Sequence, residues 1–194
     1  MSKINKSDKG FTLIELLVTI VIFGLVMTAV FGFFSISLRI QRVTLTEQEI
    51  MNESSYAIEY MSRALRMARK DMGQGCVSNS KLFYEIENTS SRLGVKFKNY
   101  KNICQEFYWD KTGKVLKEIV GSGATAEERN ITSDVLEVSS LKINLLGAGL
   151  SGSDEDDKQG RVTLSLKIKG ISLKGEIQPD LWIETTISHR NLDM

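Results

Sequence analysis

The sequence has 194 residues, a formal net charge of +1 and a single histidine. Charged residues make up 25% and hydrophobic residues 42% of the chain, which is the composition of a folded protein and excludes extensive disorder. A chain so close to neutral lacks the broad positive field that steers nucleic-acid-binding proteins to their ligand. Its length suits one domain with a membrane segment better than two domains.

A long apolar stretch follows a short basic N-terminus. No residue from Leu16 to Leu38 is charged, and a helix over this range would rise about 34 Å, enough to cross a hydrocarbon core of about 30 Å. Lys3, Lys6 and Lys9 in front of it predict a cytoplasmic N-terminus, with the rest of the chain outside the cytoplasm. The alternative is a removable secretory signal, whose apolar region is usually shorter, about 7–15 residues.

Glu15 stands at the start of this apolar stretch. A carboxylate at the centre of a membrane helix costs about 2.5–3.5 kcal/mol, and less near the interface. Two interpretations are open: Glu15 reaches the headgroups and complements the positive end of the helix, or it pairs with a positive group inside the membrane. A cut between Gly10 and Phe11 would supply such a group, because the new amine would lie one helical turn from Glu15.

The run KGFTLIE at residues 9–15, followed by apolar residues, resembles the N-terminal signal of type IV prepilins and type II secretion pseudoprepilins. The resemblance implies that a prepilin peptidase cuts between Gly10 and Phe11 and methylates the new amine of Phe11. It also implies that Glu15 neutralises the amine of a neighbouring subunit, where such a pair would set the register between subunits. The implied path runs from the inner membrane into a pilus or pseudopilus built with other pilins.

The helix is expected to continue beyond the membrane. From Ile36 to Ala68 apolar residues recur at steps of three and four, which predicts a helix reaching about residue 71. Gly73 and Gly75 are expected to end it.

The segment 47–68 resembles the helix of PilW-type minor pilins and J-type pseudopilins. The family often has a proline where Gly32 stands, and that departure also favours a minor subunit.

Basic residues are spaced along the end of this helix, at Arg63, Arg66, Arg69 and Lys70. They could meet DNA phosphates, but no aromatic residues are interleaved with them as in a nucleic-acid platform. A solvated face that complements the last helical carbonyls is the preferred interpretation, so a nucleic-acid partner is not expected.

From residue 81 onward the apolar period changes to two, which predicts strands. Ser139 and Ser140 interrupt one alternation and predict a bulge or a bend. One long helix followed by strands predicts an α+β fold in which an antiparallel sheet covers the outer half of the helix. This arrangement matches the pilin-like fold that the resemblance implies. The expected strands are 81–87, 92–97, 134–146, 161–169 and 181–188, with a hairpin over 105–120 that turns at 110–113. The expected organisation is a leader over 1–10, a membrane and filament-core helix over 11–38, its amphipathic continuation over 39–72, and a β-rich domain over 73–194.

Apolar residues on the expected strands supply the predicted core. Aromatic residues are expected to anchor packing rather than bind a ligand. The core candidates are Leu136, Val138, Val162, Leu164, Leu166, Ile183 and Ile187, and the aromatic anchors are Phe107, Tyr108, Trp109 and Trp182.

Cys76 and Cys104 both follow the membrane stretch. If residues 43–194 lie outside the cytoplasm, the compartment favours a disulfide between them. The closed loop would stabilise the domain by about 3–4 kcal/mol in the chain-entropy model. Two free buried thiols are the alternative.

Two stretches have the composition of a ligand site. Residues 147–152 fit the spacing of a dinucleotide fingerprint, but no helix is expected after them, so a flexible loop is the better interpretation. Asp154, Asp156 and Asp157 could gather around calcium, although Lys158 stands where an EF-hand needs its fifth ligand. A solvated acidic turn is expected there, and no cofactor.

No catalytic set can be assembled from the sequence. His189 is the only imidazole and lies close to the C-terminus, where a surface or edge-strand position is expected. A structural filament subunit is therefore preferred over an enzyme. The other candidate is a single-pass anchored protein whose extracytoplasmic domain binds a ligand.

Overall fold

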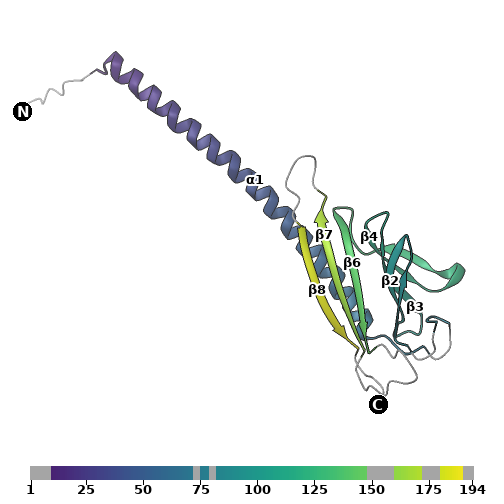
Figure 1. The fold of residues 1–194 in the computed structure, drawn as a ribbon. Helices are drawn as coiled ribbons and strands as arrows, with labels where there is room; N and C mark the ends of the chain where they lie inside the picture. Colours follow the sequence, from purple (N-terminus) through teal and green to yellow (C-terminus); the bar gives the residue numbers. More distant parts are fainter. Residues whose placement is uncertain (1–9, 72–74, 79–81, 148–159, 172–179, 190–194) are drawn as a thin grey trace, which may run out of the picture. The chain divides into compact units, whose positions relative to one another are not determined.

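The structure, a computed structural model, describes residues 10–71, 75–78, 82–147, 160–171 and 180–189 (Figure 1). Among these described residues there is one α-helix, α1, which runs from Leu13 to Arg66, and the strands found there lie after it in the sequence. The chain divides into two compact units, Met1–Thr44 and Leu45–Met194. The first holds the apolar part of α1, and the second holds its amphipathic part together with the strands. This is the expected α+β, pilin-like fold.

Helix α1 ends at Arg66, five residues before the predicted end. The amides of Met67 and Ala68 already bond to carbonyls three residues back, which tightens the last turn. The amide of Arg69 then donates to the carbonyl of Lys98 at 2.8 Å, so the chain leaves the helix to pair with a strand. Of the two glycines expected to end the helix, Gly75 lies in the loop beyond it at φ +76°, and residue 73 falls outside the described residues.

The strands form two antiparallel sheets, where one had been predicted. The two sheets meet near β6, where the amide of Val138 donates to the carbonyl of Lys114 at 2.8 Å and the indole of Trp109 donates to the carbonyl of Val138 at 2.9 Å. The first sheet has the order β1 Tyr84–Asn88, β2 Arg92–Lys98, β3 Cys104–Asp110, β4 Val115–Val120, β5 Glu127–Asn130, and the second has the order β6 Leu136–Leu146, β7 Arg161–Gly170, β8 Asp180–Ser188.

The predicted hairpin and bulge are confirmed, and one strand was missed. β3 and β4 pair around a turn in which the Asp110 carboxylate accepts hydrogen bonds from the amides of Thr112 and Gly113, at 2.9 and 3.0 Å. The register of β6 shifts between Val138 and Ser140. Strand β5 was not expected because its four residues, Glu127–Asn130, are all polar and exposed. It forms by pairing its backbone with β4.

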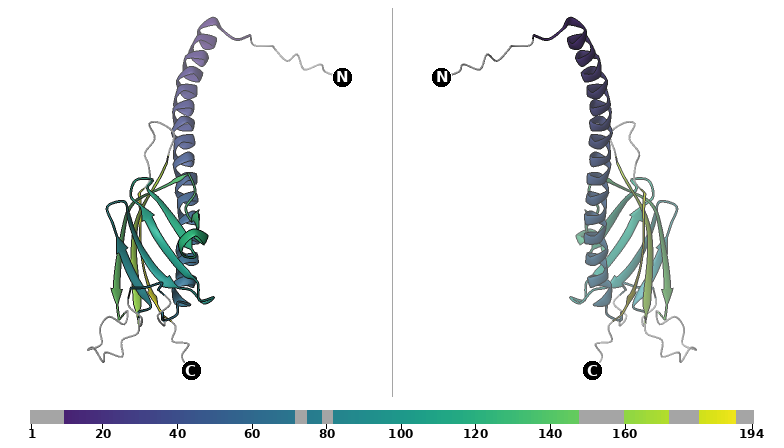
Figure 2. Two further views of the ribbon diagram at one scale, coloured as in Figure 1. Left: turned by 90° about the vertical axis from the view of Figure 1, so that its right-hand side faces the viewer. Right: turned by 90° about the vertical axis from the view of Figure 1, so that its left-hand side faces the viewer.

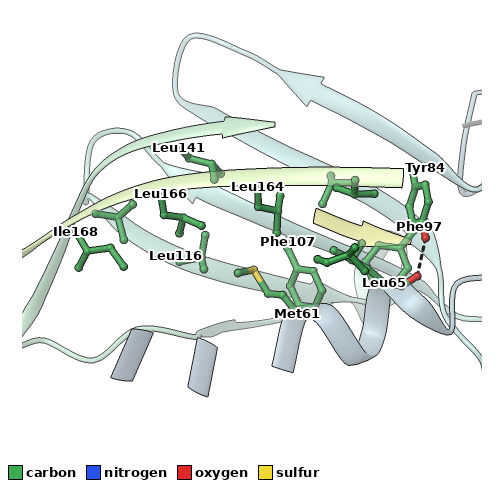
Figure 3. Close-up of a cluster of buried hydrophobic side chains, with 14 of the residues drawn as sticks. Met61, Leu65, Tyr84, Phe97, Phe107, Leu116, Leu141, Leu164, Leu166 and Ile168 are labelled. Atoms are coloured by element: carbon green, nitrogen blue, oxygen red, sulfur yellow. Dashed lines mark hydrogen bonds between the residues drawn. The ribbon is translucent and has the colours of Figure 1, made fainter. Parts of the chain in front are cut away.

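The core of the second unit lies between the helix and the two sheets. Met61 and Leu65 point from α1 toward Phe107, Leu116 and the strand residues above them (Figure 3). The Tyr84 hydroxyl donates to the carbonyl of Leu65 at 2.7 Å, so β1 is tied to the last turn of the helix. Within this unit Figure 2 shows the strands on one side of the helical segment.

The predicted core is confirmed, with Ile183 partly buried and the other six residues buried. Phe107 and Tyr108 are buried and Trp109 is partly buried. Trp182 is 55% exposed, so its assignment as a packing anchor was wrong: along β8 it alternates with Leu181 and Ile183, which pack on the core.

Of the two positions expected for His189, the surface position was wrong, whereas the other matches the structure, because His189 directly follows β8, an edge strand of the second sheet. His189 is buried at the end of β8, with its ring centroid 4.1 Å from that of Phe83. Its Nε2 lies 2.7 Å from the carbonyl oxygen of Ala68, just beyond the helix end. The imidazole therefore joins the last strand to the segment that leaves α1, which is a packing role.

Candidate functional site

The side chain of the residue just before α1 caps the first turn of the helix. Thr12 precedes the helix, and its hydroxyl accepts a hydrogen bond from the amide of Glu15 at 3.3 Å. Threonine followed three residues later by glutamate is the capping-box pattern, a signal in the sequence that the prediction did not use. The cap satisfies one of the free amides of the first turn, and Glu15 places a negative charge where the helix dipole is positive.

The residues around the predicted cut lie open. Phe11 is 78% exposed, and a Cβ added at Gly10 would have no atom within 4 Å. The fold of this chain therefore does not itself require a glycine at position 10. Any requirement for a small residue there must come from something that binds this segment.

From Leu16 to Leu38 the helix of the first unit carries no charged residue and is predominantly apolar on all sides. From residue 10 to residue 44 no residue is buried, and the part of the chain that the structure describes has one helix long and apolar enough to cross a membrane. The few hydroxyls on it bond to their own helix: Thr19 donates to the carbonyl of Leu16 at 2.8 Å, and Thr28 to that of Leu25 at 2.8 Å. Such a surface is stable in lipid or against other helices, and not in water.

Among the described residues, none forms an ion pair with Glu15. Its amide is bonded to Thr12, and its carboxylate stands on the exposed surface of the apolar helix. The structure thus places Glu15 in the first turn of α1, and Gly10 and Phe11 in the segment just before the helix.

A disulfide joins Cys76 to Cys104, with the Cα atoms 5.4 Å apart. The alternative of two free thiols was therefore wrong. The bond ties the segment that follows α1 to the start of β3. Beside it, the buried Asp71 carboxylate accepts hydrogen bonds from the amides of Cys76 and Val77 at 2.8 and 3.0 Å and lies 3.5 Å from the Lys98 ammonium.

A buried carboxylate ties the helix to the first sheet. Glu118 on β4 is fully buried and accepts hydrogen bonds from the Tyr60 hydroxyl at 2.8 Å, from the Gln105 amide and from the Arg129 guanidinium. Burial, with the adjacent Glu118 charge, raises the pKa of Tyr60, so the phenol stays a donor. The contact joins α1, β3, β4 and β5, and its role is structural.

The predicted basic stripe does not form as one helical face, because the helix ends before Arg69. Arg63 pairs with Glu59, and the Lys70 ammonium lies 5.2 Å from the centre of the Phe83 ring.

The predicted calcium candidates at 154–157 lie outside the described residues. Within the described residues, no group of three or more His, Cys, Asp or Glu side chains is placed to hold a metal ion.

Comparison with known proteins identifies the N-terminal segment. A family model described as the prokaryotic N-terminal methylation motif matches residues 5–31. No curated protein and no solved structure matches the chain significantly. The matched range contains Gly10, Phe11, the Thr12 cap and Glu15, together with much of the apolar helix. The chain thus carries an N-terminal methylation motif, the kind of signal found in type IV pilins and pseudopilins, and the matched residues do not reach the second unit.

Proposed function

We propose that the chain is a structural subunit, a minor pilin or pseudopilin, of a type IV pilus or type II secretion pseudopilus. The observation that carries this proposal is the methylation motif on a capped helix whose apolar surface is exposed all round. A helix of this kind needs lipid before assembly and other helices after it. The second unit, with its own core and disulfide, is then the part displayed outside the membrane.

Maturation begins with a prepilin peptidase that cuts after Gly10. The segment that leads into α1 supports this step, since a Cβ added at Gly10 would have no described atom within 4 Å and Phe11 is exposed. The cut leaves a positive amine on Phe11, which the same enzyme methylates. The mature chain keeps the Thr12 cap, so the helix start survives the cut.

Assembly brings the Phe11 amine of one subunit to the Glu15 carboxylate of its neighbour. Each charge alone is costly in an apolar surrounding, and together they compensate one another. Because the pair forms only when two helices align at one axial offset, it selects that register. The carboxylate of Glu15 has no ion-pair partner among the described residues of its own chain, which fits this role.

The subunit resides in the inner membrane as a single-pass protein before it enters the filament. Its N-terminus faces the cytoplasm and its second unit lies outside. The disulfide between Cys76 and Cys104 supports an oxidising location for that unit.

Filament incorporation of Glu15 variants tests the proposal. Removing one partner of a buried ion pair costs about 3–5 kcal/mol, so Glu15→Gln should lower the amount of chain in sheared filaments by about 100-fold or more. The membrane level of the variant should not fall, because the helix becomes more apolar. Glu47→Gln on the same helix is the control and should assemble normally. Normal assembly of Glu15→Gln would leave the anchored ligand-binding protein as the better account.

A further inference from the structure

The second sheet has an open edge at β8. This strand pairs antiparallel with β7 along its whole length without a register shift, and among the described residues no strand pairs with its other side (Figure 1). The opposite strand of the sheet, β6, meets the first sheet through the hydrogen bond from the Val138 amide to the Lys114 carbonyl. The second sheet can therefore gain a strand at β8.

The register shows which backbone groups point outward from β8. The amide of His189, just after the strand, donates to the carbonyl of Gly160 at 2.8 Å and continues the register of β7 and β8. Bonded and non-bonded pairs alternate along an antiparallel ladder. The odd-numbered residues of β8 therefore bond to β7, and its even-numbered residues, from Asp180 to Ser188, point their N–H and C=O groups away from it. We call this row of outward groups the β8 edge.

The sequence protects the edges of the first sheet but not the β8 edge. Proteins usually block an open edge by keeping it short or by placing charges, especially lysine, or proline on it. Strand β5 has four residues, all polar and exposed, and β1 has five, with the carboxylates of Glu85 and Glu87 among them. Strand β8 has nine residues and no lysine, arginine or proline. A long regular edge of this kind is a template for a strand of another chain.

The core face of β8 is less well covered than that of β7. Ile183 and Leu181 stand opposite Leu166 and Ile168 in the register. The two β7 residues are each 1% exposed, whereas the two β8 residues are only partly buried. A strand added beside β8 would place its own core-facing side chains against Ile183 and Leu181 and remove more apolar surface from water.

Glu184 indicates the charge of the added strand. It is exposed on the outer face of β8, and among the described residues it forms no ion pair. Asp180, by contrast, already pairs with Lys167 and Lys169 at 3.1 and 3.8 Å. Opposite charges that face one another across two strands stabilise the pairing. A second copy of β8 has no basic residue to place against Glu184, whereas a basic strand of another protein has one.

We propose that the β8 edge binds an extended segment of another protein, which joins the second sheet as an antiparallel strand. Its apolar side chains cover Leu181 and Ile183, and a lysine or arginine faces Glu184. Backbone hydrogen bonds to the even-numbered residues supply the affinity, and the alternating side chains supply the specificity. The surface lies in the second unit, so it does not depend on how the N-terminus is processed.

A capped, fluorescein-labelled peptide of sequence RVTLSLKIK is the probe. This is the sequence of β7 over residues 161–169, so it is basic and its alternation already fits β8 from the other side. Fluorescence anisotropy with the full chain in non-ionic detergent, with empty micelles as the blank, should show saturable binding of this peptide. No saturable binding would overturn the proposal.

Two N-methylated forms of the peptide test the strand geometry on the unmodified chain. In the proposed pairing the amides at the fifth and seventh positions point toward β8, and those at the fourth and sixth positions point away from it. Methylation at the fifth and seventh positions should weaken binding about tenfold or more, because two backbone hydrogen bonds are lost. Methylation at the fourth and sixth positions is the matched control and should leave the affinity within about twofold. Equal or reversed effects would overturn the proposal.

Substitutions on the chain test the same contacts from the other side. Thr186→Pro removes an outward amide without removing a hydrogen bond to β7, and it should weaken binding of the unmodified peptide about tenfold or more. Glu184→Lys should weaken it about three- to tenfold, because like charges would face one another. Glu127→Lys, an exposed acid on β5, is the control and should bind as the unmodified chain does. An unchanged affinity in Thr186→Pro would contradict the assignment.

Hydrogen exchange in the unmodified chain locates the added strand without any substitution. The peptide should slow exchange of the Glu184 and Thr186 amides about tenfold or more, while the amides of Ile183 and Thr185, which bond to β7, should change less than twofold. Protection elsewhere in the chain and not at β8 would overturn the proposal. A chain that is dimeric in detergent without peptide and monomeric as Thr186→Pro would assign the β8 edge to a second copy, and this result would also overturn it.

Discussion

Removal of the disulfide should destabilise the second unit by an amount that the loop length sets. The bond between Cys76 and Cys104 closes a loop with a sequence separation of 28 residues. In the chain-entropy model a loop of this size contributes about 3.6 kcal/mol at 25 °C, because the bond restricts the unfolded chain. That is a large share of the 5–15 kcal/mol that usually separates folded from unfolded proteins.

The double variant Cys76→Ala, Cys104→Ala is the perturbation to use, because a single substitution would leave a reactive thiol. Urea unfolding of the full chain in detergent, followed through the fluorescence of the partly buried Trp109, should give an unfolding free energy lower by about 3–4 kcal/mol. The thermal midpoint should fall by about 7–14 °C for a unit of this size. The unmodified chain under reducing conditions should unfold like the double variant.

A loss below about 1 kcal/mol would refute the entropic reasoning. It would mean that the unfolded chain is already restricted near these residues, or that the unfolding probe does not report on the segment that the bond holds.

Three further predictions concern the second unit. Glu118→Ala should lower its unfolding free energy by about 1–3 kcal/mol for each buried donor left unpaired, the Tyr60 hydroxyl and the Gln105 amide; a cycle with Tyr60→Phe should show coupling, and additive losses would contradict the shared contact. Gly94→Ala should cost about 1–3 kcal/mol in urea unfolding, because the new Cβ would lie 2.7 Å from the carbonyl oxygen of Phe107; a neutral result would refute the close approach. Burial raises the pKa of Glu106 from 4.5, so its stabilising contribution is full below that value and is lost as the pH rises through the folded pKa. Glu106→Gln should therefore be more stable than the unmodified chain at pH 7, with the difference shrinking toward pH 4, and the opposite trend would contradict the direction of the shift.

The sequence predicts the elements of this fold better than their pairing. The helical period from Ile36 onward and the alternation in residues 161–169 are local patterns, and both predict an element that the structure has, although the helix ends five residues early. The division into two sheets depends on which strands meet across the core, and no local pattern encodes that choice. Strand β5 lacks apolar residues altogether, since its pairing with β4 is made by the backbone. A backbone pairing also explains why α1 ends earlier than predicted, because Arg69 pairs with β2.

The residues of the candidate sites also differ in whether a local sequence pattern could identify them. The N-terminal motif is local, so Gly10, Phe11 and Glu15 could be named from residue order, and the Thr12 cap could have been. Glu118 carried a signal that was not used: it stands two residues after Leu116, on the core side of an alternating strand.

Mass spectrometry of the N-terminus of the chain purified from its own cells tests the central claim most directly. The account predicts a mature chain that begins with methylated Phe11 and lacks residues 1–10. A chain that retains those residues in the membrane fraction and in filaments would contradict it, because Glu15 would then have no neighbouring amine to neutralise.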